Sequence, residues 1–494
     1  MARFVSALQR KVFGLPARRT DHTVERGVPV PMRDGVPLLT DHYAPIGSAL
    51  GTVLIRTPYG RGFPESLLHG RMLAERGYHV LIQSVRGTGG SGGRLDPIAQ
   101  ETDDAQDAVA WLRTRPWFTG TLATLGGSYL GWTQWALLRE APPELRAAVI
   151  MVGPHDFGRA IHGTGRPALA DFLGWSATVQ DRGLRPMLAA RKRVATALRE
   201  YQPPEVALRG GAPWFTDWLD HADLTDPYWR PYDASSALRD TSVPMLLIGG
   251  WHDVFVEQTI EQYQTLRAHN ADVAMTIGPW THLDTAFKAA KIADNEALAW
   301  LDRHLAGTGP AREAAVHIQV TGTHDWLSMP SWPPETIDRV VLLETDGPTE
   351  FTHDPADPTP SVGGRFMSPG AGRKDNTKLE QRTDVVTFTS VPLDTDLEVF
   401  GSPRIELSAN SDVFVRLCEV DSRGRSWNIT EAFLPAAGGE LGQCAHRFRA
   451  GYRLRVQISG GAYPRYARGQ NTEHYTVGAT LTATLPAGTR PSGR

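Results

Sequence analysis

The stretch TLATLGGSYLGWTQWALL, residues 121–138, places an apolar strand, a glycine-flanked serine and an apolar helix in direct succession. This order is typical of a sharp strand-to-helix turn that presents a serine side chain. Gly126 leaves the position two residues before Ser128 free of a side chain, and Gly131 lets the helix pack closely on the strand. The second glycine falls one position later than in the G-x-S-x-G pattern. Taken alone, the stretch is equally typical of an ordinary glycine-rich turn.

Apolar runs on both sides of this stretch predict further strands of one sheet. Runs rich in Val, Ile and Leu are typical of buried parallel strands, and they lie at 51–57, 77–85, 147–153, 243–250 and 271–279. Apolar residues at helical spacing predict helices between them, at 101–114, 256–268 and 285–305. The alternation of strands and helices predicts a doubly wound, mostly parallel α/β sheet.

The rest of the chain falls into segments of different character. Residues 155–240 carry helical patterns and many aromatic residues, which predicts a helical insertion in the α/β core. Beyond residue 336, short alternating runs separated by turn residues predict a β-sandwich or jelly roll. We expect an α/β core over 22–154 and 241–307, a helical cap over 155–240, a linker over 308–335, a β domain over 336–485, and flexible ends at 1–21 and 486–494.

The composition excludes several classes of protein. The chain has 494 residues, of which 41% are hydrophobic and 21% charged, and this is typical of a globular protein with more than one domain. Its net charge of −3 lacks the basic excess of a nucleic-acid-binding protein. No stretch approaches the ~18 apolar residues of a membrane span. Arg10 and Lys11 interrupt the apolar N-terminus, which argues against a secretory signal and favours a cytoplasmic location.

The two cysteines, Cys418 and Cys444, are too few for a disulfide framework. Neither lies in a cluster with histidines, as a zinc site would need. We expect two buried thiols, although a single bridge between them stays open.

Two loops downstream of Ser128 carry the residues that would activate a serine. A serine needs a histidine base, which a carboxylate orients, and in α/β hydrolases the chain order is serine, acid, histidine. The strand at 243–250 leads into Asp253 and the strand at 271–279 leads into His282. We therefore predict Ser128, Asp253 and His282 as a catalytic triad. His252 and Asp284 are the competing candidates, and Asp253 alone would be equally typical of a helix cap.

Several motifs make this interpretation specific. They are Met32-Arg33-Asp34-Gly35, Arg56-Thr57-Pro58-Tyr59-Gly60, Val85-Arg86-Gly87-Thr88-Gly89, Arg115-Pro116-Trp117, Gly249-Gly250-Trp251-His252-Asp253, Gly278-Pro279-Trp280-Thr281-His282 and the run from Ala297 to Gly307. On these motifs, over about residues 24–480, the chain resembles the CocE/NonD hydrolase family. That family contains cocaine esterases, glutaryl-cephalosporin acylases and α-amino-acid ester hydrolases, and X-prolyl dipeptidyl-peptidases are its relatives.

The resemblance implies an α/β-hydrolase core with an inserted helical cap and a C-terminal, galactose-binding-like jelly roll. It implies Ser128 as nucleophile, His282 as general base and then acid, and Asp253 as the orienting carboxylate. The phenol of Tyr59 and the backbone N–H of Tyr129 would bind the oxyanion. The implied chemistry needs no metal and no cofactor.

The chain also departs from the family pattern. The family commonly has aspartate where Ser84 stands, and we expect this to alter a contact with Arg86. We expect the chain to lack the large N-terminal domain of some X-prolyl dipeptidyl-peptidases, and no acidic cluster for a substrate ammonium is evident in the sequence. Both observations argue against a dipeptidase.

The substrate stays open at this point. Phe255 and the cap aromatics Phe172 and Trp175 are candidates for the acyl pocket, although tryptophans at helical spacing are more often part of a core. Arg159 and Arg166 are candidates for pairing with a substrate carboxylate, or they are solvated. We predict a carboxylic ester hydrolase acting on a small ester or amide. The alternatives are an X-Pro dipeptidyl-peptidase-type or β-lactam acylase amidase, an acyltransferase, and a non-catalytic binding protein. The sequence leaves the oligomeric state open, and a dimer is one option.

Overall fold

A mostly parallel sheet forms the centre of the N-terminal half of the protein. The computed structural model describes residues 10–180, 184–269, 271–367 and 369–488. The sheet has the order β1-β2-β4-β3-β5-β6-β7-β8-β9-β10. Its strands are β1 His22–Pro31, β2 Pro37–Pro45, β3 Thr52–Thr57, β4 His79–Ser84, β5 Leu122–Gly127, β6 Leu145–Met151, β7 Met245–His252, β8 Val273–Thr281, β9 Val316–Gln319 and β10 Trp326–Met329.

Neighbouring strands from β4 to β9 run parallel, while β1, β2 and β10 add antiparallel edges. The inner strands β3 and β4 are buried along their whole length, as parallel strands covered on both faces must be. The connecting helices are η1 Ser66–Arg71, α2 Met72–Ala74, α3 Glu101–Arg113, α4 Tyr129–Leu138, α11 Val256–Ala268, α12 His282–Thr285 and α13 Ala290–His304. The predicted doubly wound α/β core is confirmed.

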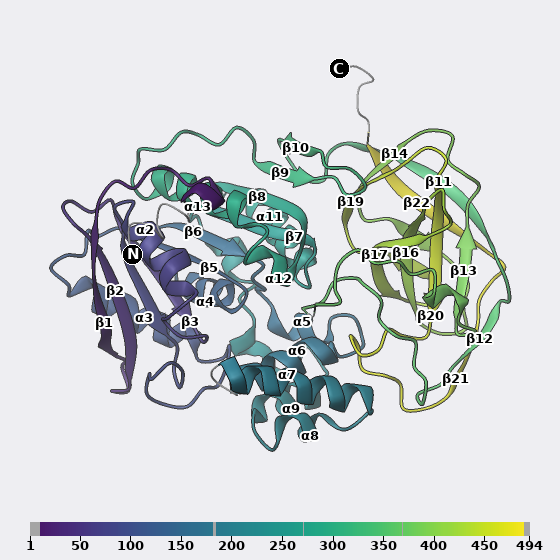
Figure 1. Ribbon diagram of the computed structural model, residues 1–494, viewed down its shortest axis with the longest axis horizontal. Helices are drawn as coiled ribbons and strands as arrows, with labels where there is room; N and C mark the ends of the chain where they lie inside the picture. Colours follow the sequence, from purple (N-terminus) through teal and green to yellow (C-terminus); the bar gives the residue numbers. More distant parts are fainter. Residues whose placement is uncertain (1–9, 181–183, 270, 368, 489–494) are drawn as a thin grey trace.

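The helical cap lies between β6 and β7, and Figure 1 shows its helices gathered below the core. Its elements are α5 Phe157–His162, α6 Leu169–Gln180, α7 Leu184–Arg199, α8 Pro204–Leu208, α9 Pro213–Asp220, η2 Pro227–Tyr232 and α10 Ala237–Asp240. Aromatic rings fill its interior: Phe157 packs edge-on against both Phe172 and Trp218. The predicted helical insertion is confirmed.

The C-terminal part is an antiparallel β domain with a hydrophobic cluster of its own. Its main sheet has the order β17-β16-β20-β13-β11-β22-β14-β19, and the predicted all-β domain is confirmed. The elements are β11 Thr336–Thr345, β12 Glu350–His353, η3 Leu379–Gln381, β13 Val385–Thr389, β14 Leu397–Gly401, β15 Arg404–Glu406, β16 Val413–Val420, β17 Ser426–Leu434, β18 Gly438–Glu440, β19 Cys444–Phe448, β20 Arg453–Ser459, β21 Glu473–Thr476 and β22 Thr480–Gly488. Cys418 and Cys444 are buried free thiols.

Two segments differ from the predicted organisation. The expected linker 308–335 contains β9 and β10, which extend the α/β sheet beyond β8 (Figure 1). These strands have only four residues each, too few to show a period in the sequence. Within the expected flexible ends, residues 10–13 are helical and residues 486–488 pair with β11, whereas 1–9 and 489–494 lie outside the described residues.

The core of the α/β part continues into the β domain. The large hydrophobic cluster around β3–β8 also includes Trp332, Phe400, Ala445 and Tyr463. Among the described residues, no helix has both the length and the apolar character needed to cross a membrane.

Candidate active site

Ser128 stands at the turn between β5 and α4 in a strained backbone conformation. Its φ of 59° and ψ of −122° are rarely adopted by a residue with a side chain and cost on the order of 1–3 kcal/mol. The Ser128 N–H donates to the carbonyl of Met151 over 2.9 Å, which fixes the turn to β6. The turn therefore holds the serine side chain at the carboxyl ends of the parallel strands.

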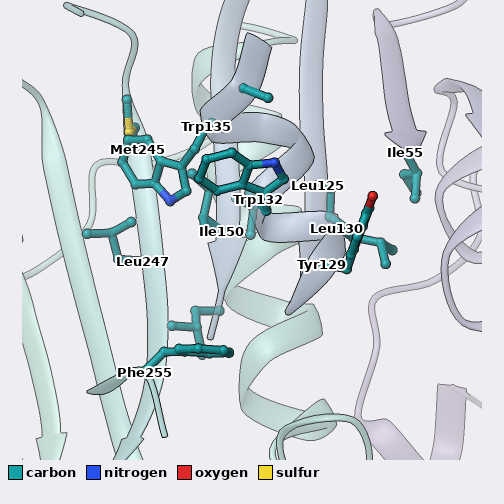
Figure 2. Packing of buried hydrophobic residues seen from close by; sticks show 14 of the residues in the cluster. Ile55, Leu125, Tyr129, Leu130, Trp132, Trp135, Ile150, Met245, Leu247 and Phe255 are labelled. Atoms are coloured by element: carbon teal, nitrogen blue, oxygen red, sulfur yellow. The ribbon is translucent and has the colours of Figure 1, made fainter. Parts of the chain in front are cut away.

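The glycines around Ser128 are required by close packing. A Cβ on Gly126 would lie 2.4 Å from Cβ of Leu130, and a Cβ on Gly131 would lie 2.7 Å from Cα of Gly153. Figure 2 shows how Leu130, Trp132 and Trp135 of α4 pack among the neighbouring strands. The predicted close approach of α4 to the sheet is confirmed.

The structure brings Ser128, His282 and Asp253 together from three different strand ends. The Ser128 hydroxyl lies 2.9 Å from Nε2 of His282, and Nδ1 of His282 lies 2.6 Å from Oδ1 of Asp253. The Asp253 side chain is fully buried, and its Oδ2 accepts the Phe255 N–H over 3.0 Å. An ionised carboxylate accepts only, so Nδ1 carries the imidazole proton and Nε2 is left to accept the Ser128 proton.

The competing candidates have other partners. Asp284 forms the capping box of α12 with Thr281 and pairs with Lys288 over 2.8 Å. His252 is buried beside the β domain, and its pKa is lowered to about 4, first by burial and then by Arg365. Asp253, and not Asp284, is therefore the carboxylate that reaches His282.

Tyr59 follows β3 and directs its hydroxyl to the same place. This hydroxyl accepts a hydrogen bond from Nε1–H of Trp175 over 3.0 Å. The ring is 48% exposed, yet burial around the hydroxyl raises the Tyr59 pKa, and the Trp175 and Ser128 side chains also act on it. The phenol keeps its proton at neutral pH and can donate to an oxyanion.

Tyr129 is the first residue of α4, so its backbone N–H belongs to the turn that has no intrahelical acceptors. Its hydroxyl donates to Oε1 of Glu101 over 2.7 Å and accepts the Ile98 N–H over 3.0 Å. Glu101 is fully buried and pairs with Arg56 over 2.8 Å. The sequence reasoning missed this anchor, although an arginine inside the buried strand TVLIRT signals a buried charged partner.

The predicted pocket residues have different surroundings. Trp175 stacks on the Tyr129 ring at 5.8 Å, and the Phe255 ring meets His282 edge-on at 5.5 Å. Phe172 is 2% exposed and packs inside the aromatic core of the cap. Trp175 and Phe255 therefore border the triad and the oxyanion side, while a contact of Phe172 with substrate stays a prediction.

Asp171 of α6 is a second acidic residue near the triad that the sequence reasoning missed. It is buried, and its Oδ1 accepts the Met367 N–H over 2.7 Å. Its Oδ2 has no hydrogen-bond partner among the described residues. Burial raises the Asp171 pKa to about 6, although the Met367 hydrogen bond and the Arg465 charge lower it, and the charges of His282 and Asp253 act on it more weakly. In the sequence, this residue is indistinguishable from an acid in the first turn of a helix.

Three further sequence expectations concern single contacts. Arg159 pairs with Glu261 over 2.9 Å, so it is an exposed ion pair. Arg166 lies 3.9 Å from Glu473. The expectation that serine at position 84 alters a contact with Arg86 stays a prediction: Ser84 accepts from Arg61 over 2.7 Å, and Arg86 pairs with Asp34 and Asp104. β4 ends at Ser84, and Arg86 in the following turn reaches Asp104 of α3. No group of three or more His, Cys, Asp or Glu side chains that could hold a metal occurs within the described residues.

Comparisons with known proteins agree with this geometry. Residues 34–284 match the family model described as X-Pro dipeptidyl-peptidase (S15 family), and residues 308–437 match the X-Pro dipeptidyl-peptidase C-terminal non-catalytic domain. The chain is 28% identical to a cocaine esterase from Rhodococcus sp. (strain MB1 Bresler), with 92% of this chain and 93% of that protein covered.

Two solved structures resemble the whole chain. One is an aminopeptidase from a marine sediment archaeon, Thaumarchaeota archaeon, with a TM-score of 0.76 and 20% identity. The other is an α-amino acid ester hydrolase, with a TM-score of 0.76 and 21% identity. Each comparison covers 96% of this chain and 98% of the other. At these identities the likeness shows the shared fold.

Proposed function

Because the chain belongs to the X-Pro dipeptidyl-peptidase (S15) family and is a serine hydrolase of the α/β-hydrolase fold, we propose that it hydrolyses carboxylic esters through an acyl-enzyme on Ser128. The resemblance to CocE/NonD hydrolases is confirmed. One observation carries the proposal: the unbroken chain of hydrogen bonds from Ser128 through His282 to Asp253, with lengths of 2.9 and 2.6 Å.

In the first half of the reaction, Oγ of Ser128 attacks the carbonyl carbon while its proton passes to Nε2 of His282. Asp253 holds Nδ1–H and stabilises the imidazolium that forms. The tetrahedral intermediate then expels the leaving group, which takes the proton from His282. In the second half, water attacks the acyl-enzyme and gives its proton to His282. The bond between the acyl carbon and Oγ of Ser128 then breaks, His282 returns the proton to Oγ, and the acid product leaves.

The negative oxygen of each intermediate is stabilised by two donors. These are the phenolic O–H of Tyr59 and the backbone N–H of Tyr129 at the start of α4, where the helix dipole favours negative charge. Trp175 donates to the Tyr59 oxygen, which directs the phenol proton away from the indole and toward the site.

The surroundings of the triad support an apolar acyl group. Phe255 and Trp175 present aromatic surface beside His282 and Tyr129. Two exposed apolar side chains come shortly after Tyr59 and His282 in the sequence: Phe63 is 79% exposed and Phe287 is 68% exposed. The similarity to a cocaine esterase supports an ester with an aromatic part. A cytoplasmic location is part of the proposal, and the two free thiols support it.

A second candidate is hydrolysis of an amide whose acyl part carries an amino group. The observation that favours it is the buried Asp171 carboxyl, whose Oδ2 has no hydrogen-bond partner among the described residues. Amides react more slowly because their leaving nitrogen must be protonated. A substrate ammonium paired with Asp171 would help to offset this disadvantage.

Initial rates on p-nitrophenyl esters, from acetyl to octanoyl and benzoyl, test the proposal together with matched p-nitroanilides that carry a free amino group. We expect ester turnover that Ser128→Ala lowers by on the order of 10⁶-fold. Preferred cleavage of the amino-bearing anilides would favour the second candidate. Unchanged ester turnover in Ser128→Ala would exclude both.

A further inference from the structure

Arg365 reaches from the segment between β12 and β13 into the α/β core. Its side chain is 6% exposed. Nε–H donates to the carbonyl of Trp251 over 3.1 Å, and Nη1 donates to Oε1 of Glu257 over 2.5 Å. Nη2 donates to the carbonyl of Gln443. One guanidinium therefore joins three separate segments of the chain.

Two of these partners bracket the acid of the triad. Trp251 lies in β7, two residues before Asp253, and Glu257 lies in the first turn of α11, four residues after it. Within the loop, the Asp253 N–H donates to the Gly250 carbonyl over 2.9 Å. The Arg365 guanidinium closes this loop from outside by linking the strand before Asp253 to the helix after it.

The β domain holds Arg365 firmly in place. The Arg365 backbone N–H donates to Glu431 of β17 over 3.1 Å, and Arg416 fixes the same carboxylate over 2.7 Å. The Gln443 N–H donates to Glu257 over 2.8 Å, so the β domain binds this carboxylate twice. A Cβ on Gly442 would lie 2.0 Å from Nη1 of Arg365, and only glycine permits this approach.

The groups around the Arg365 guanidinium compensate its positive charge. Glu257 is the acid that accepts from the guanidinium, whereas Glu431 accepts from the Arg365 backbone N–H and pairs with the side chains of Arg416 and Arg465. His252 beside it stays neutral at physiological pH, because burial and then Arg365 lower its pKa to about 4. The cationic guanidinium is thus matched to one carboxylate and two carbonyls, and a neutral replacement leaves Glu257 without this partner.

We propose that Arg365 is a positioning residue for the triad: by bridging Trp251 and Glu257 it holds Asp253 within hydrogen-bond reach of His282. The inference rests on the proposed function, because it assigns Asp253 a task only within that triad. The domain matched by the non-catalytic family model would then govern the geometry of the acid.

A looser Asp253 has a defined chemical consequence. The carboxylate stabilises the imidazolium that forms when His282 takes the Ser128 proton, so a lost or lengthened contact raises the barrier to this proton transfer. It also leaves the imidazole less well oriented, and a misplacement of about 1 Å costs about 10²-fold in rate. A merely structural defect, in contrast, would not be reversed by adding free guanidinium.

The test measures capture of Ser128 by a fluorophosphonate in the full-length protein, followed by mass spectrometry between pH 5 and 9. In this reaction the serine oxygen bonds to phosphorus, fluoride leaves and His282 takes the proton, so no substrate needs to be known. The variants are Arg365→Ala and Glu257→Gln. Arg447→Ala is the matched control, since Arg447 also joins the two parts of the molecule, by pairing with Asp325 and Glu398.

We expect Arg365→Ala to capture the probe at least about 10-fold more slowly. Millimolar guanidinium should restore the rate in this variant alone, and Glu257→Gln should show a smaller change of the same kind. Wild-type capture rates in a folded Arg365→Ala would overturn the inference, as would an equal loss in Arg447→Ala. If Arg365→Ala does not fold, Glu257→Gln decides by the same criteria. A wild-type chain that is not labelled at Ser128 would overturn the proposed function, and the inference with it.

Discussion

At the scale of single residues, Ser128 combines backbone strain with a firm anchor. Its φ of 59° is held by the hydrogen bond to Met151 and by glycines that allow Leu130 and Gly153 to approach. Strain of this kind persists only where the surrounding packing fixes it. The turn thus presents the nucleophile at a fixed position before any substrate arrives.

The oxygen of Tyr59 gives a prediction at this scale. Tyr59→Phe removes one oxyanion donor and leaves the ring in place, so we expect kcat on a p-nitrophenyl ester to fall by about 10²–10³-fold with little change in KM. Steady-state kinetics measure both parameters. Tyr201→Phe is the control, because this tyrosine packs against Tyr463 at the β domain. A rise in KM without a loss of kcat would mean that the phenol only binds substrate.

At the scale of elements, α6 places two residues of one helix face beside the active site. Asp171 and Trp175 are four residues apart, so their side chains lie one helical turn from each other. Trp175 stacks on Tyr129 and contacts the Tyr59 hydroxyl, while Asp171 lies where the charges of His282 and Asp253 act on it. One helix of the cap therefore serves both the oxyanion side and the histidine side.

Asp171 leads to a pH prediction. Its folded pKa of about 6 exceeds the ordinary value of about 3.9 for an unfolded aspartate. The folded state therefore prefers the protonated acid, and stability is lost as the pH rises from about 4 through 6. The loss amounts to at most about 3 kcal/mol above that range.

Asp171→Asn removes this ionisation and keeps an acceptor for the Met367 N–H. We expect the Tm of the variant, relative to wild type, to be clearly higher at pH 8 than at pH 4.5 in thermal denaturation. Asp394→Asn, at an exposed position, should show no such difference. A Tm difference between Asp171→Asn and wild type that is the same at both pH values would contradict the assignment.

The elements also show what the sequence can and cannot predict. The parallel strands and the turn at Ser128 were predictable, because apolar runs indicate buried strands and glycines indicate a tight turn within a few neighbouring residues. The contact of Asp253 with His282 followed from chain order. Asp171 and Arg365 were not predictable, because their importance arises from residues distant in sequence, Met367 and Trp251. Short strands such as β9 carry too few residues to show a period.

At the scale of the whole molecule, the α/β core and the β domain share hydrophobic packing. Trp332, just before β11, lies 5.4 Å from the Trp251 ring and 6.3 Å from the Phe400 ring. Its Nε1–H donates to Gln443 over 2.8 Å. The same junction contains the contacts of Arg365, so the packing that joins the domains also surrounds the loop of the triad acid.

This packing predicts that wild type unfolds in one calorimetric transition, in which esterase activity is lost together with the β domain. Trp332→Ala should cost about 3–5 kcal/mol and separate the melting of the α/β core from that of the β domain. The reason is that the deleted ring contacts both parts, through Trp251 and Phe400.

Trp427→Ala is the matched control, since that ring packs on arginines within the β domain. Scanning calorimetry combined with residual activity after heating measures both effects. Two separate transitions in wild type, or a Trp332→Ala protein as stable as wild type, would show that the two bodies fold independently, and the triad acid would then have to be held by the α/β core alone.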